Sequence, residues 1–200
     1  MTEQITTGRT NQKLRTHQAI VQAAAELSRT GREVTMPEIA QAALVSEATA
    51  YRYFPDLPSL LREAIAGQLP TPQEALAPVA DSTDPVERVA AATEFLLRHV
   101  LTRQGVVRAM IAGTIHRPAQ AASRPGLRFG LIDHALAPLD DTLAVTDPAA
   151  FTQLKYDLAV VVAAEALFNL TDLQGLDPEA AIASIVHTAT TLTWAATQTR

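Results

Sequence analysis

The chain has 200 residues, of which 48% are hydrophobic and 18% charged, and its formal net charge is −5. This composition excludes disorder of the whole chain. The longest apolar run, residues 158–164, is far shorter than the roughly twenty residues of a membrane-spanning helix. Without cysteine, disulfides and thiolate metal sites are excluded. Because the first fifteen residues lack the apolar stretch of a signal peptide, we expect a cytoplasmic protein with no membrane partner.

The charge is unevenly distributed along the chain. Residues 1–55 hold six basic and five acidic side chains, a net of +1, whereas residues 56–200 hold ten basic and sixteen acidic ones, a net of −6. A segment that binds nucleic acid is therefore expected in the first quarter of the chain. An asymmetry this small also arises by chance, so the charge alone decides nothing.

Apolar residues recur at spacings of three and four and almost nowhere alternate strictly, which predicts an all-α fold. The signals that begin and end helices include Gly31 as a helix C-cap, a capping box from Thr35 to Glu38, and three Asp-Pro steps at helix N-termini. These signals predict nine helices, at about residues 10–29, 36–43, 46–53, 56–68, 85–103, 105–117, 122–137, 149–171 and 178–197. We expect two domains, residues 1–55 and residues 56–200.

The second and third predicted helices form a helix-turn-helix, a motif that places one helix in a major groove. The positions predicted to pack these helices against the first are Ile39, Ala40, Ala43, Val45 and Tyr51. The side chains left outward on the third helix are Ser46, Glu47, Thr49, Arg52 and Tyr53. Two short helices around a tight turn also occur in helical proteins that do not bind DNA. A helical ligand-binding or partner-binding protein without specific DNA binding is therefore the alternative.

The run VTMPEIAQAALVSEATAYRYFPDLPSLLREA, residues 34–64, resembles the N-terminal domain of TetR-type transcriptional regulators. The resemblance covers roughly residues 10–65 and is most specific over residues 45–54. It implies a helix-turn-helix domain of three helices followed by a larger helical domain that binds an effector and dimerises. It also implies a ligand-responsive repressor that binds a palindromic DNA operator as a homodimer.

The resemblance assigns DNA-binding roles residue by residue. Thr35 caps the second helix and meets a phosphate, and the groove is faced by Ser46, Glu47, Ala48 and Thr49. Backbone contacts are implied for Tyr51 and Tyr53, and a base or phosphate contact for Arg52, whereas Phe54 belongs to the core. Tyr51 is equally explained by packing between helices, so Tyr53 is the stronger expectation for a contact.

Three positions depart from the family pattern. Leu44 replaces the usual glycine of the turn, Leu57 replaces a lysine that commonly touches phosphate, and Ser28 replaces a bulky residue late in the first helix. The second change is expected to weaken the salt-dependent part of DNA binding. A flexible arm along the DNA, or a solvated chain end, is predicted for the basic residues Arg9, Lys13 and Arg15.

Because one helix-turn-helix offers few contacts, a symmetric pair is expected. The last two helices carry an apolar seam, and the resemblance implies that they form the dimer interface, with Phe151, Leu154, Leu158, Val161, Ile182, Ile185, Val186, Ala189 and Leu192. The same residues are also consistent with the core of one subunit. We expect a mainly apolar effector pocket lined by Leu61, Ile65, Phe95, His99, Met110, Thr114, His116, Phe129, Glu165 and Phe168.

By analogy with the family that the sequence resembles, the fourth helix, which carries Leu61 and Ile65, is expected to couple effector binding to the separation of the two recognition helices. An enzyme is not expected. The five histidines are scattered, and the sequence contains no HExxH, no nucleotide-binding glycine loop and no GxSxG elbow. No cofactor and no metal are therefore predicted.

Overall fold

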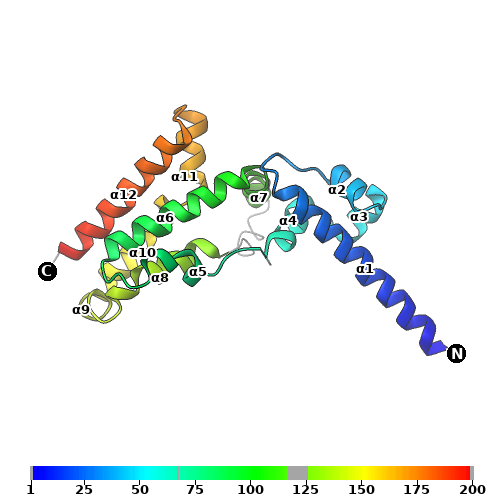
Figure 1. The fold of residues 1–200 in the computed structure, drawn as a ribbon, viewed down its shortest axis with the longest axis horizontal. Helices are drawn as coiled ribbons and strands as arrows, with labels where there is room; N and C mark the ends of the chain where they lie inside the picture. The colour runs from blue at the N-terminus through cyan, green and yellow to red at the C-terminus, as the bar shows by residue number, and fades with distance from the viewer. Residues whose placement is uncertain (1, 67, 117–125, 199–200) are drawn as a thin grey trace. The chain divides into compact units, whose positions relative to one another are not determined.

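The computed structural model describes residues 2–66, 68–116 and 126–198, with side chains from residue 10 onward except that of His116. All regular structure within these ranges is helical, so the predicted all-α fold is confirmed. The chain forms two compact units, residues 1–69 with 102–125 and residues 70–101 with 126–200. The helices of the first unit are α1 (Thr2–Ser28), α2 (Met36–Ala42), α3 (Glu47–Tyr53), α4 (Leu57–Ala66) and α7 (Gln104–His116) (Figure 1).

The second unit holds the remaining helices. Its α-helices are α5 (Pro72–Ala75), α6 (Pro85–Thr102), α8 (Leu127–Leu136), α9 (Leu143–Thr146), α10 (Pro148–Val161), α11 (Ala164–Phe168) and α12 (Pro178–Gln198). Its shorter elements are the 3-10 helices η1 (Ala77–Val79) and η3 (Ala137–Leu139) and the π-helix η4 (Asn169–Leu173). α10 packs against α8, α9 and α12, and α5 packs against α8.

The first unit is built around α1, which packs against both α2 and α4. A seven-residue helix such as α2 or α3 is too short to be stable alone in water, so burial must hold both in place. Their apolar side chains enter one core, with contributions from α1, α4 and α7. Its buried members include Ile20, Ala24, Val34, Met36, Ile39, Ala40, Ala50, Phe54, Leu60, Leu61 and Val106.

The structure has more helices than the nine predicted. The described residues contain twelve α-helices. Two of the three additional ones, α5 and α9, are single turns too short for a clear periodicity, and the third comes from the division of one predicted helix into α10 and α11. The sequence at the beginning of α5 nevertheless contains a helix start signal. Thr71 and Glu74 form a complete capping box with a proline in the first turn, the same pattern that opens α2.

The single helix predicted over residues 149–171 is wrong. α10 ends at Val161, Ala163 takes an extended conformation with φ −143° and ψ 147°, and α11 begins at Ala164. The Ala163 amide donates to the Val161 carbonyl at 2.9 Å, which closes a tight turn. Since Val162 and Ala163 are only 1% and 3% exposed, the break is maintained by tertiary burial. No proline or glycine near Val162 indicates this break in the sequence.

The first helix begins earlier than predicted. α1 starts at Thr2, so the backbone before residue 10, expected as a flexible arm or a solvated end, is helical as well. The side chain of Arg9 is outside the described part of the structure, whereas Lys13 and Arg15 are exposed. The two described cations therefore lie on the helix, but two residues apart and so on different sides of it.

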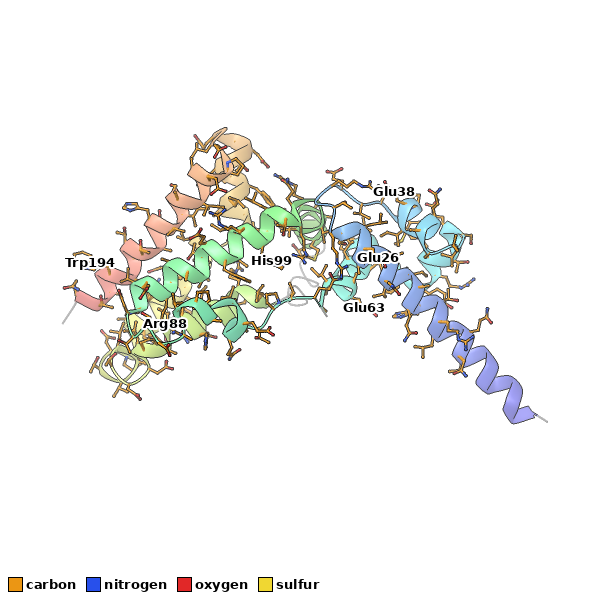
Figure 2. All side chains as sticks on the ribbon, viewed as in Figure 1. Glu26, Glu38, Glu63, Arg88, His99 and Trp194 are labelled. Atoms are coloured by element: carbon orange, nitrogen blue, oxygen red, sulfur yellow. The ribbon has the colours of Figure 1, made fainter. Side chains whose placement is uncertain are left out.

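A charged side chain lies inside the second unit. Arg88, near the start of α6 (Figure 2), is only 5% exposed. Its guanidinium donates to backbone carbonyls at the C-terminal end of α8, His134 at 2.7 Å and Ala135 at 3.2 Å. It also donates to three carbonyls that follow α5, those of Val79, Ala80 and Ser82. Arg88 thereby ties α6 to α8 and to the η1 segment.

Replacing Arg88 by methionine should destabilise the second unit by roughly 3 kcal/mol or more, because buried carbonyls would lose their donor. The measurement is the urea midpoint followed by circular dichroism. Arg98→Met, on the same helix but at an exposed position, is the matched control and should change the midpoint little. Equal effects of the two substitutions would show that the carbonyl contacts of Arg88 contribute nothing special.

Candidate nucleic-acid interface

The N-terminus of α2 is fixed by a capping box. The Glu38 amide lies 3.5 Å from Thr35 Oγ1, and the Glu38 carboxylate accepts from the Thr35 amide at 2.9 Å and from its hydroxyl at 2.8 Å. Arg32 donates to the other carboxylate oxygen. The Arg32 and Thr35 hydrogen bonds lower the pKa of Glu38 to about 2. Thr35 is exposed and caps α2 as predicted.

α3 presents a short polar surface. Its N-cap Ser46 accepts from the Thr49 amide at 3.2 Å, and the two hydroxyl oxygens lie 2.8 Å apart. Ser46, Glu47 and Ala48 are exposed and Thr49 is partly exposed. Ala50 is fully buried, which anchors the opposite face of the helix in the core. The structure therefore brings together the four residues that the resemblance places toward a groove.

The two tyrosines of α3 differ in exposure. Tyr51, predicted to pack against the first helix, is 47% exposed, so its predicted burial is wrong. Tyr53, ranked as the stronger contact, is partly buried against the core. The Arg52 guanidinium carbon lies 5.7 Å from the centre of the Tyr53 ring, within cation–π range. Tyr51 and Arg52 are thus the more accessible pair, and Phe54 is buried as expected.

His17, a residue of α1 that contacts the end of α3, was not predicted from the sequence. The ring of His17, on α1, lies 5.0 Å from the ring of Phe54 and 6.2 Å from that of Tyr53. Its Nε2 lies 3.4 Å from a carboxylate oxygen of Glu63 on α4. His17 therefore contacts the last turn of α3 and α4 together. The only signal in the sequence was its position three residues before the core residue Ile20.

The three departures from the family pattern each have a structural consequence. Leu44 forms the turn with φ +55° and is 93% exposed, a left-handed conformation that costs an L-residue roughly 1–2 kcal/mol. Leu57 is partly buried against the core at the start of α4, so an apolar contact occupies the position of the usual lysine. Ser28 is fully buried, and its hydroxyl donates to the Ala24 carbonyl.

The compact unit that contains α2 and α3 is more basic than the first quarter of the sequence. Residues 1–69 and 102–125 carry eleven basic and seven acidic side chains, a net of +4. The remaining residues carry five basic and fourteen acidic ones, a net of −9. The increase comes from the second segment, which brings four arginines and no acidic residue. A net positive unit attracts a polyanion such as DNA.

The residues predicted for the effector pocket divide between the two units. In the first, Leu61 and Ile65 are buried in the core and Met110 packs against it, while the Thr114 hydroxyl donates to the Ile111 carbonyl at 2.8 Å. The His116 side chain lies outside the described residues. The effector pocket stays a prediction.

In the second unit, the rings of Phe95 and His99 on α6 stack with 6.2 Å between their centres. Phe129 is 52% exposed, and the Arg128 guanidinium carbon lies 4.7 Å from the centre of its ring. Arg128 also lies 3.9 Å from Glu165, which is exposed. Phe168 is 9% exposed. Arg128 therefore connects two of the predicted pocket residues, although sequence reasoning did not select it.

Most residues predicted for a dimer interface already pack inside the second unit, where α10 lies against α12. Buried in this way are Phe151, Leu154, Leu158, Ile182, Ile185 and Ala189, whereas Val161, Val186 and Leu192 are partly exposed. The same two helices carry three large exposed side chains that the seam pattern did not include. These are Tyr156 at 64%, Val160 at 75% and Trp194 at 58% exposed; Trp194 is labelled on α12 in Figure 2.

The capping box of α2 predicts a pH dependence of stability. Because the pKa of Glu38 is lower in the folded protein, its charged form stabilises the fold above the ordinary pKa of 4.5, and this contribution is lost as the pH falls toward about 2. Glu38→Gln should therefore be less stable than the wild type at pH 6, and the difference should shrink between pH 4.5 and pH 3.

The measurement is the urea midpoint of both proteins across this range. Glu74→Gln is the comparison, since the lowered pKa of Glu74 comes from Thr71 without a guanidinium and should give a weaker dependence. A wild-type advantage that stays constant from pH 6 to pH 3 would contradict the assignment.

Among the described residues, no group of three potential metal ligands lies together, and no helix is long and apolar enough to cross a membrane.

The family model described as "Bacterial regulatory proteins, tetR family" matches residues 19–64. No curated protein and no solved structure matches the chain with significance. The match spans α2, α3, α4 as far as Ala64 and the part of α1 that packs on them. Residues 19–64 are the N-terminal helix-turn-helix domain of the tetR family of bacterial regulatory proteins.

Proposed function

We propose that the protein is a transcriptional repressor that binds a palindromic DNA operator as a homodimer and is released by a small, mainly apolar effector. The observation that carries the proposal is the outward face of α3, where Ser46, Glu47, Ala48, Tyr51 and Arg52 are exposed around the buried anchor Ala50. Small residues in the first turn allow a close approach to base edges, while the longer side chains reach the flanking phosphates.

The individual contacts follow from the chemistry of each side chain. Arg52 supplies a cation for a phosphate or for the acceptor edge of guanine. Glu47 carries no donor, so in a groove it pairs with a base amino group such as that of cytosine. The Thr35 hydroxyl already donates its hydrogen bond to the Glu38 carboxylate. A phosphate near Thr35 is therefore best received beside Arg32, which offsets the charge of Glu38.

We assign DNA binding to residues 1–55 and effector binding with dimerisation to residues 56–200. The second assignment is supported by apolar and aromatic side chains that remain accessible in the acidic unit. The stacked pair Phe95 and His99, together with exposed Phe129 beside Arg128, provides apolar surface with polar handles. α4 is the coupling element, because it packs on α1 and on α7. An effector that binds the protein but leaves operator affinity unchanged would exclude this coupling.

For dimerisation we propose the exposed surfaces of α10 and α12. Tyr156 and Val160 are four residues apart on α10 and therefore share a face, and Trp194 adds an aromatic side chain on α12. Exposed aromatic and aliphatic side chains of this size are typical of the centre of an interface. The partly exposed Val161, Val186 and Leu192 are expected at its edge.

The test of DNA binding is a double substitution, Tyr51→Ala with Arg52→Ala. Both side chains are exposed, so folding should be preserved while each half-site loses two contacts. Contacts of this kind are worth roughly 1–3 kcal/mol each, so operator affinity should fall by about 100-fold or more. The operator is first selected from genomic fragments with the wild-type protein, and binding is measured by fluorescence anisotropy.

The control for this experiment is Gln73→Ala, at an exposed position on α5, which should bind like the wild type. If the wild-type protein selects no fragment even at low salt, the DNA-binding proposal is wrong and the alternative of a helical ligand-binding or partner-binding protein stands. If the double variant binds as tightly as the wild type, α3 is not the reading helix.

Dimerisation is tested with Val160→Glu. A carboxylate placed in an apolar interface must be desolvated without a partner, so the variant should sediment as a monomer at micromolar concentration where the wild type sediments as a dimer. Val145→Glu, a similar change at a position on α9 that is 69% exposed, serves as the control and should leave the dimer intact. A dimeric Val160→Glu variant would place the interface elsewhere.

A further inference from the structure

We propose that Gly105 and Gly113 of α7 are positioning residues for DNA binding. They allow α7 to lie directly against the loop that precedes α2 and against the first turn of α4. This inference rests on the proposed function, because it explains how the helix-turn-helix is held in the orientation that an operator requires. It also extends that function beyond residues 1–55, to a helix that the domain match does not include.

The first contact joins two backbones. A Cβ atom at Gly105 would lie 2.1 Å from the Arg32 carbonyl oxygen, 2.4 Å from the Arg32 carbonyl carbon and 2.6 Å from the Glu33 amide nitrogen. Side-chain rotation cannot relieve such overlaps, because all three atoms belong to the main chain. The Gly105 amide also donates to the Gly31 carbonyl at 3.2 Å. Only glycine fits at this position without moving the loop.

The loop of residues 31–33 is also constrained by a second close contact, between Gly31 and Thr102. Gly31 has φ +72°, and a Cβ atom there would lie 3.3 Å from the Thr102 carbonyl oxygen. Glycine is thus required twice where residues 31–33 meet residues 102–105. From this loop the side chain of Arg32 reaches Glu38, which in turn holds Thr35 at the N-terminus of α2. A displacement of the Arg32 backbone therefore acts on the cap of the first helix of the motif.

The second contact fixes the beginning of α4. A Cβ atom at Gly113 would lie 2.5 Å from Cγ and 2.9 Å from Cβ of Pro58. Between the two glycines, Val106 is 1% exposed in the core, and Ala109 and Met110 pack against that core. α7 is therefore part of the folded body of the DNA-binding unit, with close contacts near both of its ends.

The chain connectivity gives this arrangement a second role. Only Arg103 separates the last residue of α6 from the first residue of α7, and α6 belongs to the second unit as far as Leu101. Any shift of the end of α6 is therefore applied within a few residues to the contact between Gly105 and Arg32. This path reaches the loop before α2 through Gly105, in addition to the contact that α7 makes with α4 at Gly113.

The experiment compares Gly105→Ala and Gly113→Ala with Gly126→Ala, where an added Cβ meets no atom within 4 Å. Each protein is titrated against the fragment selected by the wild type, and against the same fragment with the half-site separation changed by one base pair in either direction. The first two substitutions should weaken binding to the original fragment on the order of tenfold, since relieving the overlap displaces backbone. They should also change which separation binds best, whereas Gly126→Ala should match the wild type.

Two further measurements separate positioning from loss of folding. The active fraction of each variant is determined by stoichiometric titration, because partial unfolding lowers binding to every fragment by the same factor and leaves the preferred separation unchanged. In Gly113→Ala, the added change Pro58→Gly removes both overlapping atoms and should restore affinity relative to Pro58→Gly alone. Unchanged affinity and unchanged preferred separation in both glycine variants, or a uniform loss without rescue, would overturn the inference. A wild-type protein that binds no DNA would instead overturn the proposed function.

Discussion

Everything that the candidate interface presents depends on one apolar core shared by five helices. α2 and α3 are seven residues long each and cannot hold their shape alone. They are ordered because Ile39, Ala50 and Phe54 enter the same core as Ile20 of α1 and Leu61 of α4. The polar face of α3 is therefore defined from behind, by the fully buried Ala50. A loss of packing anywhere in this core would therefore shift the outward side chains of α3.

Sequence reasoning succeeded where the determining interactions are local. The capping box at Thr35, the Ser46 cap of α3 and the left-handed turn at Leu44 involve residues within three positions of one another. It failed where distant residues decide. The break after Val161 arises within a sequence that favours a helix, and it is stabilised by burial that no window of neighbouring residues contains.

The same distinction explains the two tyrosines. Their alternation on a helical wheel does not say which lies nearer to α1, because that depends on how α3 is rotated against its partners. The structure resolves the rotation through His17, whose ring meets Phe54 and approaches Tyr53. With Ala50 and Phe54 buried, Tyr53 lies against the core near a histidine thirty-six residues earlier in the chain, and Tyr51 is exposed. Composition and motif alone could not supply that contact.

The electrostatic character of the DNA-binding unit follows from the fold as well. A cut at residue 55 gives a net charge of +1, whereas the compact unit carries +4, because the chain returns to it at residue 102 with four arginines. At physiological salt the screening length is about 8 Å, so an excess of this size steers DNA only near the surface of the unit itself. Orientation must then come from short-range contacts. α7 carries Arg108, directly follows Arg103 and fixes the α1–α2 loop through Gly105, so it contributes to both requirements.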